Sequence, residues 1–151
     1  MWRPARFVSL SAVADDDELR LRPLGGEDDL AVFERLNDPA EAGEYNWRGF
    51  RNIVDLRRGL AENGLLGTDR NYCIIWRGDE RLGFVAWRKL DTGPTSYCWN
   101  IGIHLQPEAR GKGYGTAAQR QLAEYLFAHT PVNRVEADTE VDNIAEQRAL
   151  E

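Results

Sequence analysis

Three strand-like segments that follow one another between residues 72 and 105 constrain the fold of this chain more than any other feature. The segments 72–76, 81–90 and 96–105 are rich in apolar and aromatic side chains, and only short turns separate them. Because short turns join neighbouring strands in antiparallel order, the three segments predict an antiparallel meander. A chain with this centre is built on a β-sheet.

Segments with other periodicities flank the meander. Apolar residues recur at helical spacing over 28–36, 50–63 and, most strongly, 113–130, and a last helix begins near residue 142. The segments 18–24 and 134–139 alternate polar and apolar residues and predict a first and a last strand. The order β-α-α-β-β-β-α-β-α predicts an α/β (α+β) fold with a mixed, mostly antiparallel sheet flanked by helices. The long helix should join two parallel strands.

Length and charge limit the class of protein. The 151 residues suit one domain over residues 18–151, after a leader of residues 1–17 that ends in three aspartates. No apolar stretch is long enough to cross a bilayer and no secretion signal is present, so we expect a cytoplasmic protein that binds no membrane. The net charge of -6 argues against nucleic-acid binding.

Cysteine and histidine usage argues against a metal site and against a disulfide framework. Cys73 and Cys98 lie in separate apolar segments, and neither belongs to a C-x-x-C pair. The two histidines, His104 and His129, are far apart. We therefore expect two buried thiols and no metal.

The segment between the third meander strand and the long helix carries the strongest functional pattern. Gly111, Gly113 and Gly115 allow several backbone N–H groups to face one point, and a helix N-terminus favours negative charge. Arg110 and Lys112 add mobile positive charge at the same place. The pattern predicts a site for a diphosphate, with a tight connection between two elements as the plainer alternative.

Two other diphosphate-binding loops do not match. The string G-x-x-x-x-G-K-[ST] is absent, which argues against a nucleotide-hydrolysing loop. A dinucleotide loop of the form G-x-G-x-x-G has a glycine where this chain has Thr116, and it follows an early parallel strand rather than a meander. A nucleotide-using enzyme is therefore disfavoured.

Three segments resemble the GCN5-related N-acetyltransferases, the GNAT family. Residues 110–115 are similar to the coenzyme A loop Q/R-x-x-G-x-G/A of that family. Together with this loop, residues 100–105 and 142–151 resemble the branch that includes the ribosomal-protein N-terminal alanine and serine acetyltransferases. The resemblance covers roughly residues 19–151, and the family's fold agrees with the element order derived above.

The resemblance implies transfer of an acetyl group from acetyl-CoA to a primary amine, on a peptide N-terminus or a small molecule. It implies that backbone N–H groups of residues 111–116 hold the diphosphate, and that the backbone of residues 103–105 pairs with the pantetheine arm and polarises the acetyl carbonyl. The residues expected to bind coenzyme A are Ile103, His104, Leu105, Arg110, Gly111, Lys112, Gly113, Tyr114, Gly115, Thr116 and Asn143.

The catalytic base and acid stay open, with three candidates. Strand parity places Asn100 and His104 on one face, where His104 either accepts a proton, directly or through water, or is hydrogen-bonded within the sheet. Asn100 stands where relatives often carry glutamate. Glu146 stands where close relatives often have serine, and it is either an acid or base or a solvated residue of a helix face.

Residues 38–49 are expected to form a surface loop over the acceptor site. Its candidates for substrate binding are Glu44, Tyr45 and Trp47. The aromatic rings could hold an alkylammonium group by cation–π contact, or they could simply pack onto the domain.

Relatives continue beyond the last helix with a final pair of strands that shape the acceptor pocket, whereas this sequence stops inside that helix. We therefore expect a C-terminally shortened GNAT fold with an open sheet edge at 134–139, through which the protein could form homo-oligomers. Three alternatives stay open: further residues complete the chain, a partner supplies the strands, or the protein is an impaired relative that binds acyl-CoA or a partner without turnover.

Overall fold

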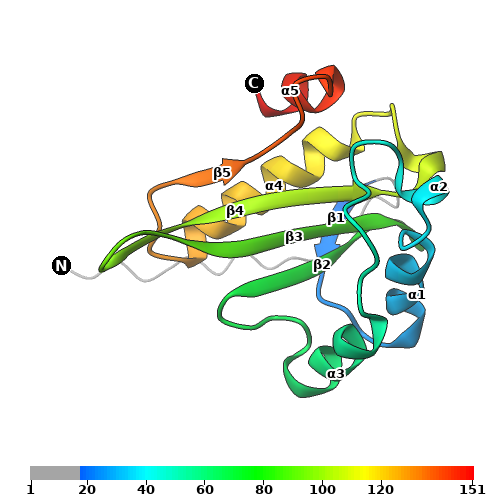
Figure 1. Cartoon of the computed structure of the whole chain (residues 1–151), viewed down its shortest axis with the longest axis horizontal. Helices are drawn as coiled ribbons and strands as arrows, with labels where there is room; N and C mark the ends of the chain where they lie inside the picture. Colours follow the sequence, from blue (N-terminus) through cyan, green and yellow to red (C-terminus); the bar gives the residue numbers. More distant parts are fainter. Residues whose placement is uncertain (1–17) are drawn as a thin grey trace.

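The computed structural model describes residues 18–151, and the expected leader lies outside the described residues. One sheet is covered by α4 on one face and by α1 and α3 on the other (Figure 1). The strands are β1 (Leu19–Arg22), β2 (Arg70–Arg77), β3 (Glu80–Gly93), β4 (Ser96–Leu105) and β5 (Val135–Ala137). The helices are α1 (Glu27–Arg35), α2 (Pro39–Ala42), α3 (Ile53–Asn63), the 3-10 helix η1 (Pro107–Ala109), α4 (Tyr114–His129) and α5 (Ile144–Leu150).

The strand pairing confirms the predicted α+β fold and its mixed sheet. Strands β1 to β4 are antiparallel neighbours in chain order, and β5 pairs with β4 in parallel. The parallel pair is short, since it runs only from Trp99 opposite Val135 to Ile101 opposite Ala137. The crossover between these two strands contains α4, as predicted.

Alternation along the strands creates a core on each face of the sheet. On one face Val85 packs with Leu122 of α4, and both are fully buried. On the other face Phe33 of α1 stacks on Phe84 of β3, with ring centroids 4.1 Å apart. Burial of one such side chain stabilises the fold by roughly 1.5–3 kcal/mol, so these contacts fix α1 and α4 against the sheet.

The prediction of a loop over residues 38–49 was wrong in one respect, because this segment contains the short helix α2. Asp38 caps this helix by accepting a hydrogen bond from the N–H of Ala40 at 2.8 Å, and Pro39 occupies the first helical position. Strand β5 is also shorter than the predicted 134–139.

Capping sets the limits of α3, which begins later than predicted. The side chain of Asn52 accepts a hydrogen bond from the N–H of Asp55 at 3.2 Å, so the helix begins after Asn52. It ends before Gly64, and the left-handed backbone of Gly64 (φ 67°) is typical of a glycine that follows a helix.

Strand β5 is the last strand of the sheet within residues 18–151, and it pairs on one side only. Self-association through this edge stays a prediction.

None of the helices in the described part of the chain is long and apolar enough to cross a membrane, and the cytoplasmic location stays a prediction.

The expectation for the cysteines is confirmed: Cys73 and Cys98 are both buried free thiols. Burial raises the pKa of the Cys73 thiol to about 11. Among residues 18–151 no group of three or more His, Cys, Asp or Glu side chains is placed to hold a metal ion.

Candidate functional site

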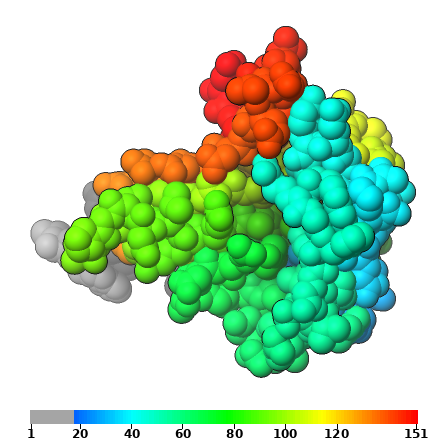
Figure 2. Space-filling view, viewed as in Figure 1, coloured from blue at the N-terminus to red at the C-terminus, as the bar shows by residue number. Residues whose placement is uncertain are grey.

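One cleft of about 860 Å³ follows β4 and brings together segments that are far apart in the sequence. Its walls come from the segment 42–51, the strands β2 to β4, the residues before and at the start of α4, the segment 138–140 and α5. Figure 2 shows the segment 42–51 (cyan) standing against the strands of the meander (green) on this side of the molecule. The cleft contains most of the residues selected from the sequence.

The backbone of β4 has unused hydrogen-bond donors where β5 leaves it. The N–H of Trp99 donates to the carbonyl of Arg134 at 3.4 Å, which lies on the β5 side. Donors alternate along a strand, so the N–H groups of Ile103 and Leu105 point to the same side. Pairing with β5 stops at Ile101, and the chain then diverges from β4 toward α5 (Figure 1). These two N–H groups therefore face the cleft rather than a strand.

The residues before α4 leave a second set of donors open. The first hydrogen bond within α4 runs from the N–H of Ala117 to the carbonyl of Gly113 at 3.2 Å, so residues 114–116 have no helical partner for their N–H groups. No side chain of the described residues caps this end. Gly111 and Gly113 have left-handed backbones (φ 72° and 83°), and a Cβ on either would meet no described atom within 4 Å. The donors thus face open space.

Arg110 is not the mobile cation that the sequence predicted. Its guanidinium donates to the carbonyl of Leu105 at the end of β4 (Nη2, 2.8 Å) and to the carbonyl of Ala42 at the end of α2 (Nη2, 3.0 Å). It therefore ties α2 and the following segment to the end of β4. Lys112, in contrast, is exposed and forms no ion pair with any residue of 18–151, so it remains available beside the open donors.

His104 is a neutral side chain held by an arginine. Its ring stacks on Phe84 at 4.6 Å, and its Nε2 lies 3.3 Å from Nη2 of Arg51. Burial, with the Arg51 charge adding to it, lowers the pKa of His104 to about 3. The imidazole thus accepts the Arg51 hydrogen bond through Nε2. Its catalytic role stays a prediction.

Asn100 bridges two charged side chains at the floor of the cleft. Its Oδ1 accepts a hydrogen bond from Nε of Arg88 at 3.2 Å, and its Nδ2 donates to Asp138 at 2.9 Å. The amide therefore links β3 to the segment that follows β5. The site it occupies lies on the same face as His104, as parity predicted.

Two residues of α5 and its cap also line the cleft. Asn143 caps α5, because its Oδ1 accepts a hydrogen bond from the N–H of Glu146 at 3.2 Å. The carboxylate of Glu146 accepts a hydrogen bond from Gln119, a buried residue of α4. The Oε1 of Gln119 has no partner among the described residues. Sequence reasoning missed Gln119, since one glutamine on a helix gives no pattern.

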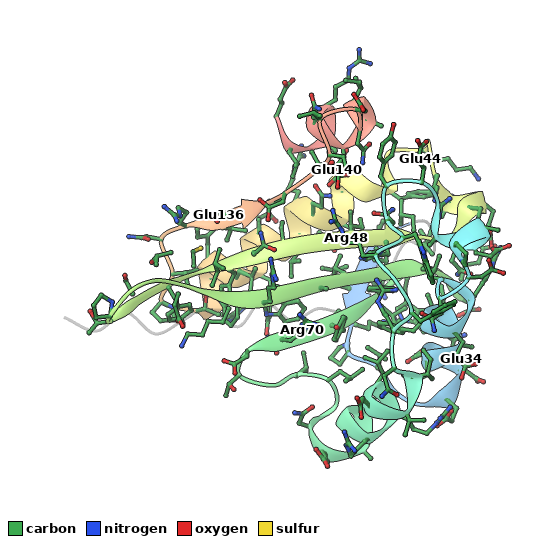
Figure 3. All side chains as sticks on the ribbon, viewed as in Figure 1. Glu34, Glu44, Arg48, Arg70, Glu136 and Glu140 are labelled. Atoms are coloured by element: carbon green, nitrogen blue, oxygen red, sulfur yellow. The ribbon has the colours of Figure 1, made fainter. Side chains whose placement is uncertain are left out.

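The segment after α2 closes on the far wall of the cleft. The hydroxyl of Tyr45 donates to the carbonyl of Asp142 at 3.2 Å, and Arg48 forms an ion pair with Glu140 at 3.4 Å. Figure 3 shows Glu44, Arg48 and Glu140 at this closure. Glu44 and Tyr45 line the cleft, and their role in binding the acceptor stays a prediction.

Trp47 does not line the cleft. Its ring packs edge-to-face on the exposed Phe50, with centroids 4.9 Å apart. This geometry matches the alternative that the aromatic rings of the loop pack onto the protein instead of binding a substrate. A role of Trp47 in substrate binding stays a prediction.

Sequence reasoning missed the arginines of the acceptor side. Arg51 precedes α3, Arg70 begins β2 and Arg88 lies in β3, and all three line the cleft. No short motif connects them, because strand register brings Arg70 beside Arg88, and Arg51 reaches the cleft from a segment outside the sheet. The only available signal was strand parity, which places Arg70 and Arg88 on one face once the register is known.

Residues 18–151 match the family described as acetyltransferase (GNAT) domain. The chain is 26% identical over 131 residues to a protein of Bacillus licheniformis named "Uncharacterized N-acetyltransferase p20". The aligned region covers 84% of this chain and 72% of that protein. The family match spans nearly all of the described residues.

Solved structures show the same fold. The aminoglycoside acetyltransferase AAC(6')-Ib in complex with coenzyme A aligns with a TM-score of 0.68 and 22% identity, over 88% of this chain and 81% of that one. The spermidine N-acetyltransferase of Vibrio cholerae, in complex with CoA and spermine, aligns with a TM-score of 0.66 and 16% identity, over 87% and 77%. At these identities the likeness establishes the architecture alone.

Proposed function

Because the chain belongs to the acetyltransferase (GNAT) domain family, whose members use acetyl-CoA to acetylate amines, we propose that it acetylates a primary amine by direct attack. The free amine attacks the thioester carbonyl, a C–N bond forms, the C–S bond breaks, and coenzyme A leaves as a thiol. The amine must first lose its ammonium proton. The protein's part is to orient the two substrates and to handle that proton.

The observation that carries the proposal is that two sets of unused backbone donors face one cleft. The N-terminus of α4 lines the cleft through Gly113, Gly115 and Thr116, and its open N–H groups, with Lys112 next to them in the chain, suit a diphosphate. The N–H groups of Ile103 and Leu105 suit an extended amide chain and an acyl oxygen. Coenzyme A contains both kinds of acceptor, so the residues present fit it.

The side chains of the cleft divide the work of removing the proton from the amine. His104 is a weak base, since its pKa lies near 3 and Arg51 occupies its Nε2. We assign His104 to positioning and Glu146, whose carboxylate lines the cleft, to accepting the proton through water. Asn100 orients its neighbours rather than reacting.

The acceptor is a peptide N-terminus or a small amine. Similarity of residues 100–105 and 142–151 to the ribosomal-protein N-terminal acetyltransferases supports the first of these. The aminoglycoside and spermidine acetyltransferases named above share the architecture of this chain, which supports the second.

The test is amine-dependent release of the coenzyme A thiol. The protein is incubated with acetyl-CoA and a panel of peptides and small amines, thiol is followed with a chromogenic disulfide, and products are identified by mass spectrometry. We expect thiol release together with an acetylated amine for at least one acceptor. Stabilisation by coenzyme A without release on any amine would instead indicate a binding protein.

A further inference from the structure

The acceptor half of the cleft contains arginines that have no carboxylate partner among the described residues, 18–151. Arg48 is paired with Glu140, but Arg51, Arg70 and Arg88 form no ion pair with any residue of 18–151. The chain as a whole carries a net charge of -6, so this group of cations is a local exception. Figure 3 shows Arg48 and Arg70 on the side of the molecule that holds the cleft.

Two of these arginines face each other across a strand pair. Arg70 of β2 and Arg88 of β3 are direct partners in the antiparallel register, and Asn100 of β4 follows in the same row. Like charges at directly opposite positions destabilise a sheet. Asn100 holds Arg88 through Nε, which leaves the terminal nitrogens of that guanidinium for another acceptor.

The third arginine is partly buried. The guanidinium of Arg51 lies over the Phe84 ring, 5.0 Å from its centroid, and its only hydrogen-bond partner within residues 18–151 is the ring of His104. Burial lowers the pKa of Arg51, the nearby Tyr72 opposes this, and the charge of Arg70 lowers it further. A partly desolvated cation without a counter-ion costs free energy that a bound anion would recover.

The floor between these arginines is open. Ala86 and Gly102 form the next row on the same face of the sheet, and a Cβ on Gly102 would meet no described atom within 4 Å. The small residues leave room above the sheet, beside the N–H of Ile103 that faces the cleft. An acceptor lying on this floor would place its amine near β4 and its other end among the guanidiniums.

We propose that the acceptor is an amine that also carries a carboxylate, and that Arg51, Arg70 and Arg88 bind this carboxylate. Guanidinium groups bind carboxylates through paired hydrogen bonds, and they hold their charge at any physiological pH. The proposal rests on the proposed function, because it names the substrate class for the same transfer. It covers amino acids and peptides with an acidic side chain near the N-terminus.

The test compares acceptors that differ only at the end remote from the amine. Each ω-amino acid with three to six carbons is compared with the alkylamine and the diamine of equal length. Peptides Ser-Asp, Ser-Asn and Ser-Lys extend the comparison to N-termini. We expect kcat/KM for the carboxylate member to exceed both others by roughly tenfold or more, as for a hydrogen-bonded ion pair. An equal or higher value for the neutral or cationic member in every set would overturn the proposal.

Variants separate the arginines from general charge effects. Arg70→Gln with Arg88→Gln should remove most of the preference, measured as the ratio of kcat/KM for the ω-amino acid to kcat/KM for the alkylamine of equal length. The matched control is Arg58→Gln, because Arg58 is an exposed residue of α3 that pairs with Asp55 and does not line the cleft. A preference that survives the double variant would contradict the proposal.

A binding readout distinguishes failure of the inference from failure of the proposed function. The N-acetyl derivative of each ω-amino acid, and its carboxamide, are added to the protein without coenzyme A, and the shift in Tm is measured. A larger shift with the carboxylate, absent in the double variant, supports the anion site even if no amine releases thiol. If the carboxylate and the carboxamide give equal shifts in Tm, and alkylamines release thiol, the anion site is overturned while acetyl transfer stands.

Discussion

Gly113→Glu is the substitution that separates coenzyme A binding from folding. Gly113 caps α4 with φ 83°, and a Cβ there meets no described atom within 4 Å, so a Cβ at this position does not clash. The left-handed backbone costs a residue with a Cβ about 1–2 kcal/mol. A carboxylate at the helix N-terminus recovers about 0.3–1 kcal/mol of this. We expect a net loss near 1 kcal/mol, which lowers Tm by about 2–4 °C.

The effect on coenzyme A binding should be far larger. A ligand at a hundred times its Kd stabilises the folded state by about 2.7 kcal/mol, which corresponds to a rise in Tm of roughly 5–10 °C for the unsubstituted protein. The new carboxylate would occupy the space in front of the N–H groups of residues 114–116 and repel a diphosphate. We therefore expect no rise in Tm for Gly113→Glu by differential scanning fluorimetry.

Gly64→Glu is the matched control. Gly64 also has a left-handed backbone (φ 67°) and open space around its Cβ position, but it ends α3 and does not line the cleft. This variant should lose at least as much stability as Gly113→Glu and keep the full rise in Tm with coenzyme A. If both variants keep that rise, the diphosphate does not bind at α4 and the reasoning is refuted.

Three further results are expected. The pKa of His104 is lowered from 6.5 to about 3 in the folded protein. As the pH falls from 7 to 4, the imidazole of His104 is therefore protonated in the unfolded state and stays neutral in the folded state. His104 should therefore cost about 2 kcal/mol of stability at pH 5 relative to pH 7, and His104→Gln should reduce this difference in urea unfolding. Arg110→Met leaves the carbonyls of Leu105 and Ala42 without their donor and should cost about 2–4 kcal/mol of unfolding free energy; a loss below 0.5 kcal/mol would contradict the tie. Because Cys73 and Cys98 are buried, a thiol reagent at pH 8 should label neither until denaturant is added, and rapid labelling of the native protein would show that the core opens.

The elements that sequence reasoning placed correctly are those with local signals. The strand 96–105 coincides with β4, because its alternation and the turn before it are both visible in the sequence. The stop of α3 before Gly64 follows from a glycine that can adopt a left-handed backbone. Helix α2 was missed because its four residues are too few to show a helical period, although Asp38 before Pro39 is a capping signal.

The site divides in the same way. The open donors at α4 were predicted from one short stretch of sequence, residues 110–116, since glycines and a helix start act locally. The role of Arg110 could not be predicted in this way, because the carbonyl of Ala42 to which it donates lies 68 residues away in the sequence. The pairing of Arg70 with Arg88 depends on strand register, and the neutral state of His104 depends on its burial and on the approach of Arg51. Such features follow only from tertiary structure.

A crystal structure with coenzyme A bound would test the central claim most directly. We predict diphosphate oxygens within hydrogen-bond distance of the N–H groups of residues 114–116, and the pantetheine arm against the N–H of Ile103 in the gap where β5 leaves β4. A diphosphate bound elsewhere, or N–H groups at the start of α4 that are hydrogen-bonded to the protein itself, would contradict the account.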